Sequence, residues 1–143
     1  MRAAIAALAL LLSACVAPAR SFSAYEGKAV KTAEDVTSAV ETARLAVRVA
    51  IRDRTFAPTL SVILGEAEKD AGAAQGTFDS VQPPDDRSLE LRSKLDELMQ
   101  PAVSALADLR IAVRSGRLDE LQETAEPLVK IGAALSAFSE SHS

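Results

Sequence analysis

The sequence predicts an all-α protein that folds as an antiparallel up-down-up-down four-helix bundle. Apolar residues recur at spacings of three and four along nearly the whole chain after residue 23, which is the helical period. The alternation of apolar and polar residues that marks a strand is sustained nowhere. The breaks between the periodic segments are short, so successive helices are expected to pack as antiparallel neighbours.

Two amphipathic helices are predicted in the first half of the domain. The first covers about residues 24–53, with an apolar face made of Val36, Val40, Ala43, Val47 and Ile51. The second covers about residues 55–81, with an apolar face made of Phe56, Leu60, Ile63, Ala67, Ala71, Ala74, Phe78 and Val81. Pro58 falls in the first turn of the second helix, where its missing N–H group is not needed.

Residues 82–88, "QPPDDRS", separate the two halves, because the prolines stop a helix and Asp85 or Asp86 can cap the next one. The third helix covers about residues 86–115, with a face made of Leu91, Leu95, Leu98, Ala102, Ala105, Leu109 and Ala112. Gly116 suits a left-handed C-terminal cap. The fourth covers about residues 117–140, with a face made of Leu118, Leu121, Ala125, Leu128, Ile131, Leu135 and Phe138.

Pro101 and Pro127 lie inside the third and fourth helices, where each should remove a backbone hydrogen bond and bend its helix. Two interpretations are open. Either the bends widen the interior or form a hinge, or they simply curve each helix around its neighbours.

An internal repeat supports this layout. The segment "SAVETARLAVR", residues 38–48, aligns without gaps with "SALADLRIAVR", residues 104–114, with six of eleven positions identical. Three further residues of insertion bring "TFAP", residues 55–58, onto "TAEP", residues 124–127. A true duplication and a chance similarity of Ala-rich helices both predict two stacked helical hairpins, with pseudo-twofold symmetry in the first case.

The N-terminal segment has the outline of a secretory signal peptide. Met1 and Arg2 precede an unbroken apolar run from Ala3 to Leu12. The run is too short to span a bilayer, which needs about 20 apolar residues, and no later segment is comparably apolar. A signal peptide over residues 1–14 and no transmembrane helix are therefore expected.

The residues that follow, Leu12-Ser13-Ala14-Cys15, resemble the lipobox of bacterial lipoproteins. The resemblance covers about a tenth of the chain. It implies that the Cys15 sulfur receives a diacylglycerol and that the chain is cut just before this residue. Cys15 is the only cysteine, so it cannot form an internal disulfide. Two or more acyl chains hold a protein stably on a membrane.

This resemblance divides the chain into a signal peptide, a lipidated cysteine with a flexible tether over residues 15–23, and a helical domain over residues 24–143. The predicted location is the extracytoplasmic face of the cell membrane. Val16 stands where an aspartate, in Gram-negative lipoproteins, resembles an inner-membrane retention signal. An outer-membrane location is therefore open in such a cell.

The charge balance argues against a nucleic-acid partner. The chain has 16 Lys and Arg against 20 Asp and Glu, a formal charge of −4, and loss of Arg2 with the signal peptide leaves −5. Binding to a phosphate backbone needs a clustered excess of cations. Trp is absent and aromatic residues are scarce, so a base-stacking platform is not expected either.

The sequence offers few groups for catalysis or metal binding. His142 is the only histidine and lies one residue from the end, so the Glu-x-x-His pairs of a di-iron bundle cannot be formed. With Cys15 acylated, no thiol remains for zinc, haem or a nucleophile–base pair. The expectation is a protein without enzymatic activity, metal or cofactor.

Two sets of arginines lie one turn apart near the ends of the first and third helices. They are Arg44, Arg48 and Arg52, and Arg110, Arg114 and Arg117. In an up-down-up-down bundle both sets gather at the end distal to the lipid. They form either a basic surface for an acidic partner, or a structural end in which cations suit helix C-termini and are neutralised by Asp119, Glu120, Glu123 and Glu126.

Two functions remain open at this point. The first is an interaction or structural module that presents a helical face to another envelope protein. The second is a binding protein for a small apolar ligand held between the helices near Tyr25, Phe56, Phe78 or Phe138. An enclosed apolar cavity favours the ligand, whereas a solid core with an exposed apolar strip favours the interaction module.

Overall fold

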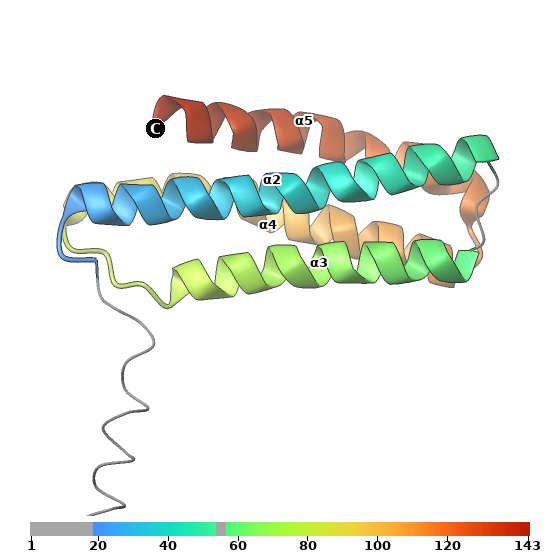
Figure 1. The fold of residues 1–143 in the computed structure, drawn as a ribbon, viewed down its shortest axis with the longest axis horizontal. Coiled ribbons are helices and arrows are strands. Elements are labelled where there is room, and N and C mark those ends of the chain that lie inside the picture. The colour runs from blue at the N-terminus through green and yellow to red at the C-terminus, as the bar shows by residue number, and fades with distance from the viewer. Residues whose placement is uncertain (1–18, 54–56) are drawn as a thin grey trace, which may run out of the picture.

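A computed structural model of the chain describes residues 19–53 and 57–143. It contains four long helices, α2 (Phe22–Asp53), α3 (Ala57–Asp79), α4 (Asp86–Arg114) and α5 (Leu121–Ser141), and a short 3-10 turn, η1 (Leu118–Glu120), before α5. Helices α2 and α4 run in one direction and α3 and α5 in the other (Figure 1). The predicted all-α, up-down-up-down bundle is confirmed.

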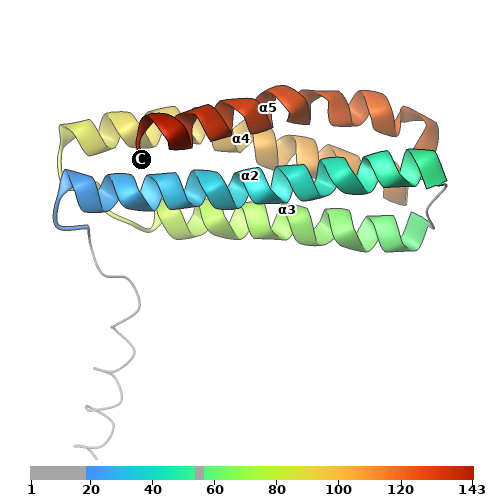
Figure 2. The same ribbon diagram turned by 45° about the horizontal axis from the view of Figure 1, so that its top comes forward.

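The bundle has a rhombic cross-section. Helix α2 packs against α3 and α5 and also meets α4 across the diagonal, whereas α3 and α5 do not meet within the described ranges. Ala29, Ala33 and Ala43 of α2 are fully buried, and side chains this small let helix backbones approach closely. Helix α2 lies alongside α3 in both views (Figures 1 and 2).

The apolar faces read from the sequence form most of the core. Its largest fully buried side chains are Tyr25, Phe78, Leu60, Leu64, Leu95, Met99, Leu106, Leu109, Leu128, Leu135, Val36 and Val40. Helix α4 buries more positions than a three-four repeat provides, including Met99, Leu106 and Val113, because it packs against three other helices. No helix in the described part of the chain is long and apolar enough to cross a membrane.

Two residues expected in the core are exposed. Ile51 is 46% exposed and Leu118 is 44% exposed, while Ala50 and Leu121 are buried in their place. Ile51 lies in the last turn of α2, where fewer neighbouring residues remain to cover it. Leu118 belongs to η1 rather than to a helix that starts at residue 117, so its side chain does not follow the helical face.

The helix ends follow the sequence signals. Asp85 caps α4, since its carboxylate accepts hydrogen bonds from the Ser88 backbone N–H at 2.9 Å and from the Ser88 hydroxyl at 2.7 Å. Gly116 has φ of 74°, a conformation that favours glycine. The Gly116 N–H donates to the Val113 carbonyl and the Arg117 N–H to the Ala112 carbonyl, which is the Schellman arrangement.

The bundle begins earlier in the chain than the expected tether boundary at residue 23. Helix α2 starts at Phe22, and Ala19 is buried against the core. The Arg87 guanidinium carbon lies 3.8 Å from the centre of the Phe22 ring, a cation–π distance. Ala19 and Phe22 therefore belong to the folded domain, because their side chains pack against the core.

Pro101 and Pro127 lie inside α4 and α5 as expected, and both rings are exposed to solvent. A proline on the outer side of a helix leaves a carbonyl unpaired where water can bind it. Such a site favours curvature around the bundle over a widened interior.

The two repeat segments occupy equivalent positions in α2 and α4. Ser38 and Ser104 are both exposed, Arg44 and Arg110 are both half-buried, and Val47 and Val113 are both buried. Equivalent side chains of the two repeat segments are therefore buried or exposed alike in the hairpins α2–α3 and α4–α5.

Candidate functional site

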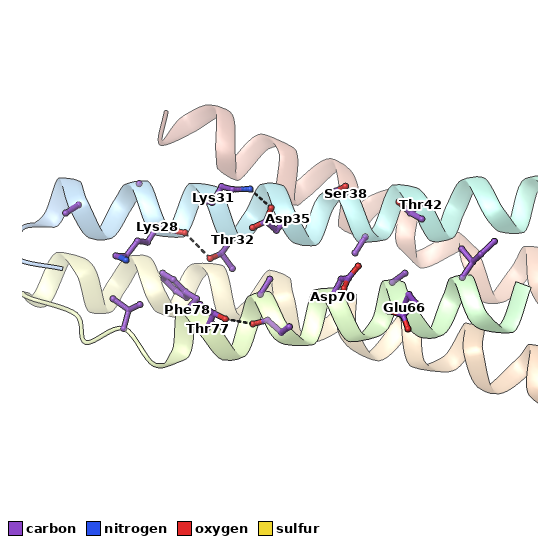
Figure 3. Close-up of a pocket in the computed structure, with 18 of the residues that line it drawn as sticks. Lys28, Lys31, Thr32, Asp35, Ser38, Thr42, Glu66, Asp70, Thr77 and Phe78 are labelled. Carbon is purple, nitrogen blue, oxygen red and sulfur yellow. Dashed lines mark hydrogen bonds and ion pairs between the residues drawn. The ribbon is translucent and has the colours of Figure 1, made fainter. Parts of the chain in front are cut away.

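A long open groove of about 950 Å³ runs between α2 and α3 on the surface of the bundle. Its α2 side is formed by residues between Ala24 and Thr42, and its α3 side by residues between Val62 and Phe78, and Val81 also lines it. Figure 3 shows the two helices on either side of the groove. The groove is a surface feature, not an enclosed cavity.

The groove has an apolar floor and short walls. Ala39, Ala67 and Phe78 line it and are buried, so they form its bottom. The walls contain Ala, Ser, Thr and Gly, whose short side chains leave the space between the helices open. Val62 also lines the groove and is 65% exposed, so a large apolar side chain faces solvent here.

The two ends of the groove have opposite charge. Lys28 and Lys31 of α2 lie toward the end where α2 begins, and Asp70 and then Glu66 of α3 lie toward the other end (Figure 3). The separation arises because α3 runs antiparallel to α2. Two of these side chains have partners on their own helices, since Lys31 pairs with Asp35 and Glu66 with Lys69.

A partly buried polar cluster joins α2, α3 and α4 near the basic end of the groove. Arg92 donates from Nη2 to the Asp79 backbone carbonyl and to Asp79 Oδ1, both at 3.2 Å. Its Nε lies 3.8 Å from Asp96 Oδ2. The hydroxyl of the fully buried Tyr25 and Oδ1 of Asp96 have no hydrogen-bond partner within the described ranges.

Burial controls the titration of this cluster. It raises the pKa of the Tyr25 phenol, against the opposing effect of the Arg92 charge. Burial also raises the pKa of the Asp96 carboxyl, and the neighbouring Asp79 carboxylate adds to that rise. Tyr25 packs against Phe78, with ring centres 5.1 Å apart. Arg92 therefore links α4 to α3, Tyr25 of α2 joins through its ring, and the guanidinium already faces two carboxylates.

The arginines singled out in the sequence lie where the topology predicts, near the ends of α2 and α4, which share one end of the bundle (Figure 1). Most of them have partners. Arg44 pairs with Glu41, Arg117 with Glu120 at 2.9 Å, and Arg110 with Glu68 of α3. Arg52 also interacts with a neighbouring group.

Arg48 and Arg114 are exposed and form no ion pair with any residue that the structure describes. Of the four acidic residues expected to neutralise the arginines, Glu120 of η1 pairs with Arg117. Arg110 instead bridges α4 to α3. This distribution favours a structural role for the paired arginines and leaves two cations accessible to solvent.

The end that carries these arginines also has a smaller pocket of about 550 Å³. It is lined by Ala50, Ile51, Leu60, Leu118, Asp119, Leu121 and Gln122. Ile51 and Leu118, the two exposed residues that were expected in the core, therefore line one pocket formed by α2, α3, η1 and α5.

Of the described aromatic residues proposed for a small apolar ligand, only Phe78 lines either of these two pockets. Tyr25 and Phe78 contact each other, whereas Phe138 stacks on His142 with ring centres 4.4 Å apart. Phe56 lies outside the described residues, as do the predicted signal peptide, Leu12, Ser13, Ala14 and Cys15. In the described part, no three His, Cys, Asp or Glu side chains are grouped so as to hold a metal ion.

The sequence reading did not identify the groove or the Tyr25–Asp96 cluster. A signal for the groove was present, because Lys28 and Lys31 share a face of α2 with small residues, while Glu66 and Asp70 do the same on α3. The cluster had no local signal, since its members are brought together from three helices. The chain matches no protein-family model, no curated protein and no solved structure.

Proposed function

We propose that this chain is a lipid-anchored, non-enzymatic helical bundle on the extracytoplasmic side of a bacterial membrane, and that it binds another protein through the α2–α3 groove. The lipobox-like residues Leu12 to Cys15 support the anchor. The single observation that carries the binding role is the open groove, which combines an apolar floor with charged ends.

The anchor would attach the bundle at the end where α2 begins. Cys15 precedes Ala19, the first described residue, by four positions, a span of at most about 14 Å for an extended chain. Helix α2 has 32 residues, so the arginine-bearing end lies roughly 48 Å from the start of α2. A bundle held at one end leaves the sides of its helices accessible to a partner.

The form of the groove favours a protein partner over a small molecule. It extends along α2 from Ala24 to Thr42, about 27 Å at the helical rise, which is the length of a partner helix rather than of a drug-sized ligand. Small-molecule sites enclose most of their ligand. Amphipathic helices bind in open apolar grooves of this kind.

The repeat provides a matched experiment. A photoreactive amino acid replaces Ser38, which lines the groove, or the equivalent Ser104 of α4, which is also exposed but does not line it. Irradiation of intact membranes should give a discrete crosslinked protein from position 38 and not from position 104. Equal crosslinking from both positions, or none from position 38, would contradict binding through the groove.

A further inference from the structure

We propose that the partner of the α2–α3 groove is a second copy of this chain, bound in an antiparallel two-fold arrangement. This inference rests on the proposed role of the groove as the interaction surface and names its occupant. In such a dimer the basic end of each groove, Lys28 and Lys31, faces the acidic end of the other, Glu66 and Asp70.

The order of the charges along the groove supports the antiparallel direction. Along the groove, from the end where α2 begins, the charged residues follow one another in the order Lys28, Lys31, Asp35, Asp70 and Glu66 (Figure 3). The position of each residue along the groove is called its level. A two-fold axis across the groove, near the level of Asp35, exchanges its two ends. It sets Lys28 and Lys31 at the height of Glu66 and Asp70 of the other copy, twice in each dimer. The two copies of Asp35 then lie near the axis, each paired with Lys31 of its own helix.

A parallel dimer lacks this match. A two-fold axis along the bundle sets each level against the same level of the other copy, so lysines lie beside lysines and carboxylates beside carboxylates. Electrostatic complementarity of this kind fixes direction and register more than it adds affinity. An isologous interface also needs a surface that complements itself, and the charged ends of the groove oppose unlike charges in the antiparallel direction.

The side chains at the two ends of the groove also differ in size. The acidic end carries Val62, the most exposed large apolar side chain in the described part of the chain. The basic end carries Ala24 and Gly27, and a Cβ atom added at Gly27 would meet nothing within 4 Å. The same two-fold axis moves the protruding Val62 toward the end with the smallest side chains.

The dimer would set the two chain starts at opposite ends of the assembly. If Cys15 is acylated as proposed, both anchors reach one membrane when the bundles lie along its surface. The pairing itself does not require the lipid, so its test can be separated from that of the anchor.

The charge pattern allows a reciprocal test with two double variants of the full chain in detergent. Lys28→Glu with Lys31→Glu makes the groove acidic throughout, and Glu66→Lys with Asp70→Lys makes its acidic end basic. Native mass spectrometry should find a dimer for the unaltered chain, dimer affinity weakened by about tenfold or more for each variant alone, and a mixed dimer when the variants are combined.

The control reverses two exposed lysines outside the groove, Lys94→Glu with Lys130→Glu, and should leave the dimer intact. A monomeric unaltered chain, or a dimer unaffected by either groove variant, would overturn the proposal. If the chain is monomeric but position 38 crosslinks a different protein, the groove binds a partner and only self-pairing is wrong.

A second measurement does not depend on the folding of the double variants. Ser38 lies near the level of the proposed two-fold axis, so Ser38→Cys should give a disulfide-linked dimer under mild oxidation of intact membranes. Ser104→Cys, on the equivalent surface of α4, should not. Equal yields of linked dimer from the two positions, or none from position 38, would contradict the antiparallel pairing.

Discussion

Arg110 of α4 holds the carboxylate of Glu68 on α3, although the two residues are 42 positions apart in the chain. The Arg110 guanidinium donates from Nε to Glu68 Oε2 and from Nη2 to Oε1, the second at 3.2 Å. This hydrogen bonding raises the pKa of the arginine further. The pair connects two helices, whereas Arg44–Glu41 and Arg117–Glu120 each lie within a few residues along the chain.

This difference predicts that Arg110 contributes more to the stability of the domain than Arg114 does. Arg110→Glu should lower the melting temperature measurably, because it removes a two-point ion pair and sets a carboxylate against Glu68. Arg114→Glu should leave it within about a degree, as expected for an exposed charge without a partner. Thermal unfolding followed by circular dichroism compares them, and the effect should shrink in high salt. Equal losses would mean that the α3–α4 pair contributes nothing specific.

Glycines on two helices provide a second matched pair. A Cβ atom at the buried Gly132 of α5 would lie 2.9 Å from Glu41 Oε1 and 3.3 Å from Val40 Cγ1, whereas one at Gly72 of α3 would meet nothing within 4 Å. Gly72→Ala should stabilise the domain by up to about 1 kcal/mol through helix propensity. Gly132→Ala should lose this gain, because the exposed Glu41 side chain can move away but the buried Val40 must shift by a few tenths of an ångström.

Chemical denaturation measures both changes. A stabilising Gly132→Ala variant would show that α2 and α5 can move apart without loss, and that their close approach is not fixed by this glycine.

The Asp96 carboxyl predicts a dependence on pH. Its pKa is raised mainly by burial, so its charged form is disfavoured in the folded state. Its contribution to stability is therefore present at low pH and is lost as pH rises through the raised pKa. Asp96→Asn should raise the melting temperature near neutral pH, and the difference from the unaltered chain should vanish in acid.

Melting temperatures between about pH 3 and pH 8 test this prediction, with the exposed Asp108→Asn of the same helix as control. A lower melting temperature for Asp96→Asn at neutral pH would mean that attraction to Arg92 outweighs the burial of the charge.

Leu109 and Leu118 test the assignment of the core. Leu109 is fully buried and Leu118 is 44% exposed. Leu109→Ala should destabilise the domain by ~2–5 kcal/mol, in the range for large-to-small core changes. Leu118→Ala should cost less than about 1 kcal/mol. Denaturant titration of the two variants checks both, and similar losses would contradict the register of α4 or the exposed position of η1.

Periodicity was sufficient to predict the fold because it reports which side of each helix is apolar. It failed at Ile51 and Leu118, where a helix end or a 3-10 turn changes how an apolar residue is covered. Asp85 and Gly116 were identifiable because a helix cap depends on one residue and its immediate neighbours.

The candidate site was harder to predict from the sequence. A groove depends on how far apart two helices pack, and small residues such as Ala39 and Ala67 read equally well as close contact or as open space. The pairing of Arg110 with Glu68 and the approach of Tyr25 to Asp96 depend on three-dimensional register, which the residue pattern of a single helix does not contain.

The central claim, attachment through a lipid on Cys15, is tested most directly by the mass and location of the mature chain. In a bacterial host, the unaltered chain should fractionate with membranes and begin at Cys15, with a mass increased by a diacylglycerol or by further acyl chains. Cys15→Ser should lack this added mass and either leave the membrane or keep its signal peptide. A Cys15→Ser chain that is cleaved normally and still held in the membrane would contradict the account.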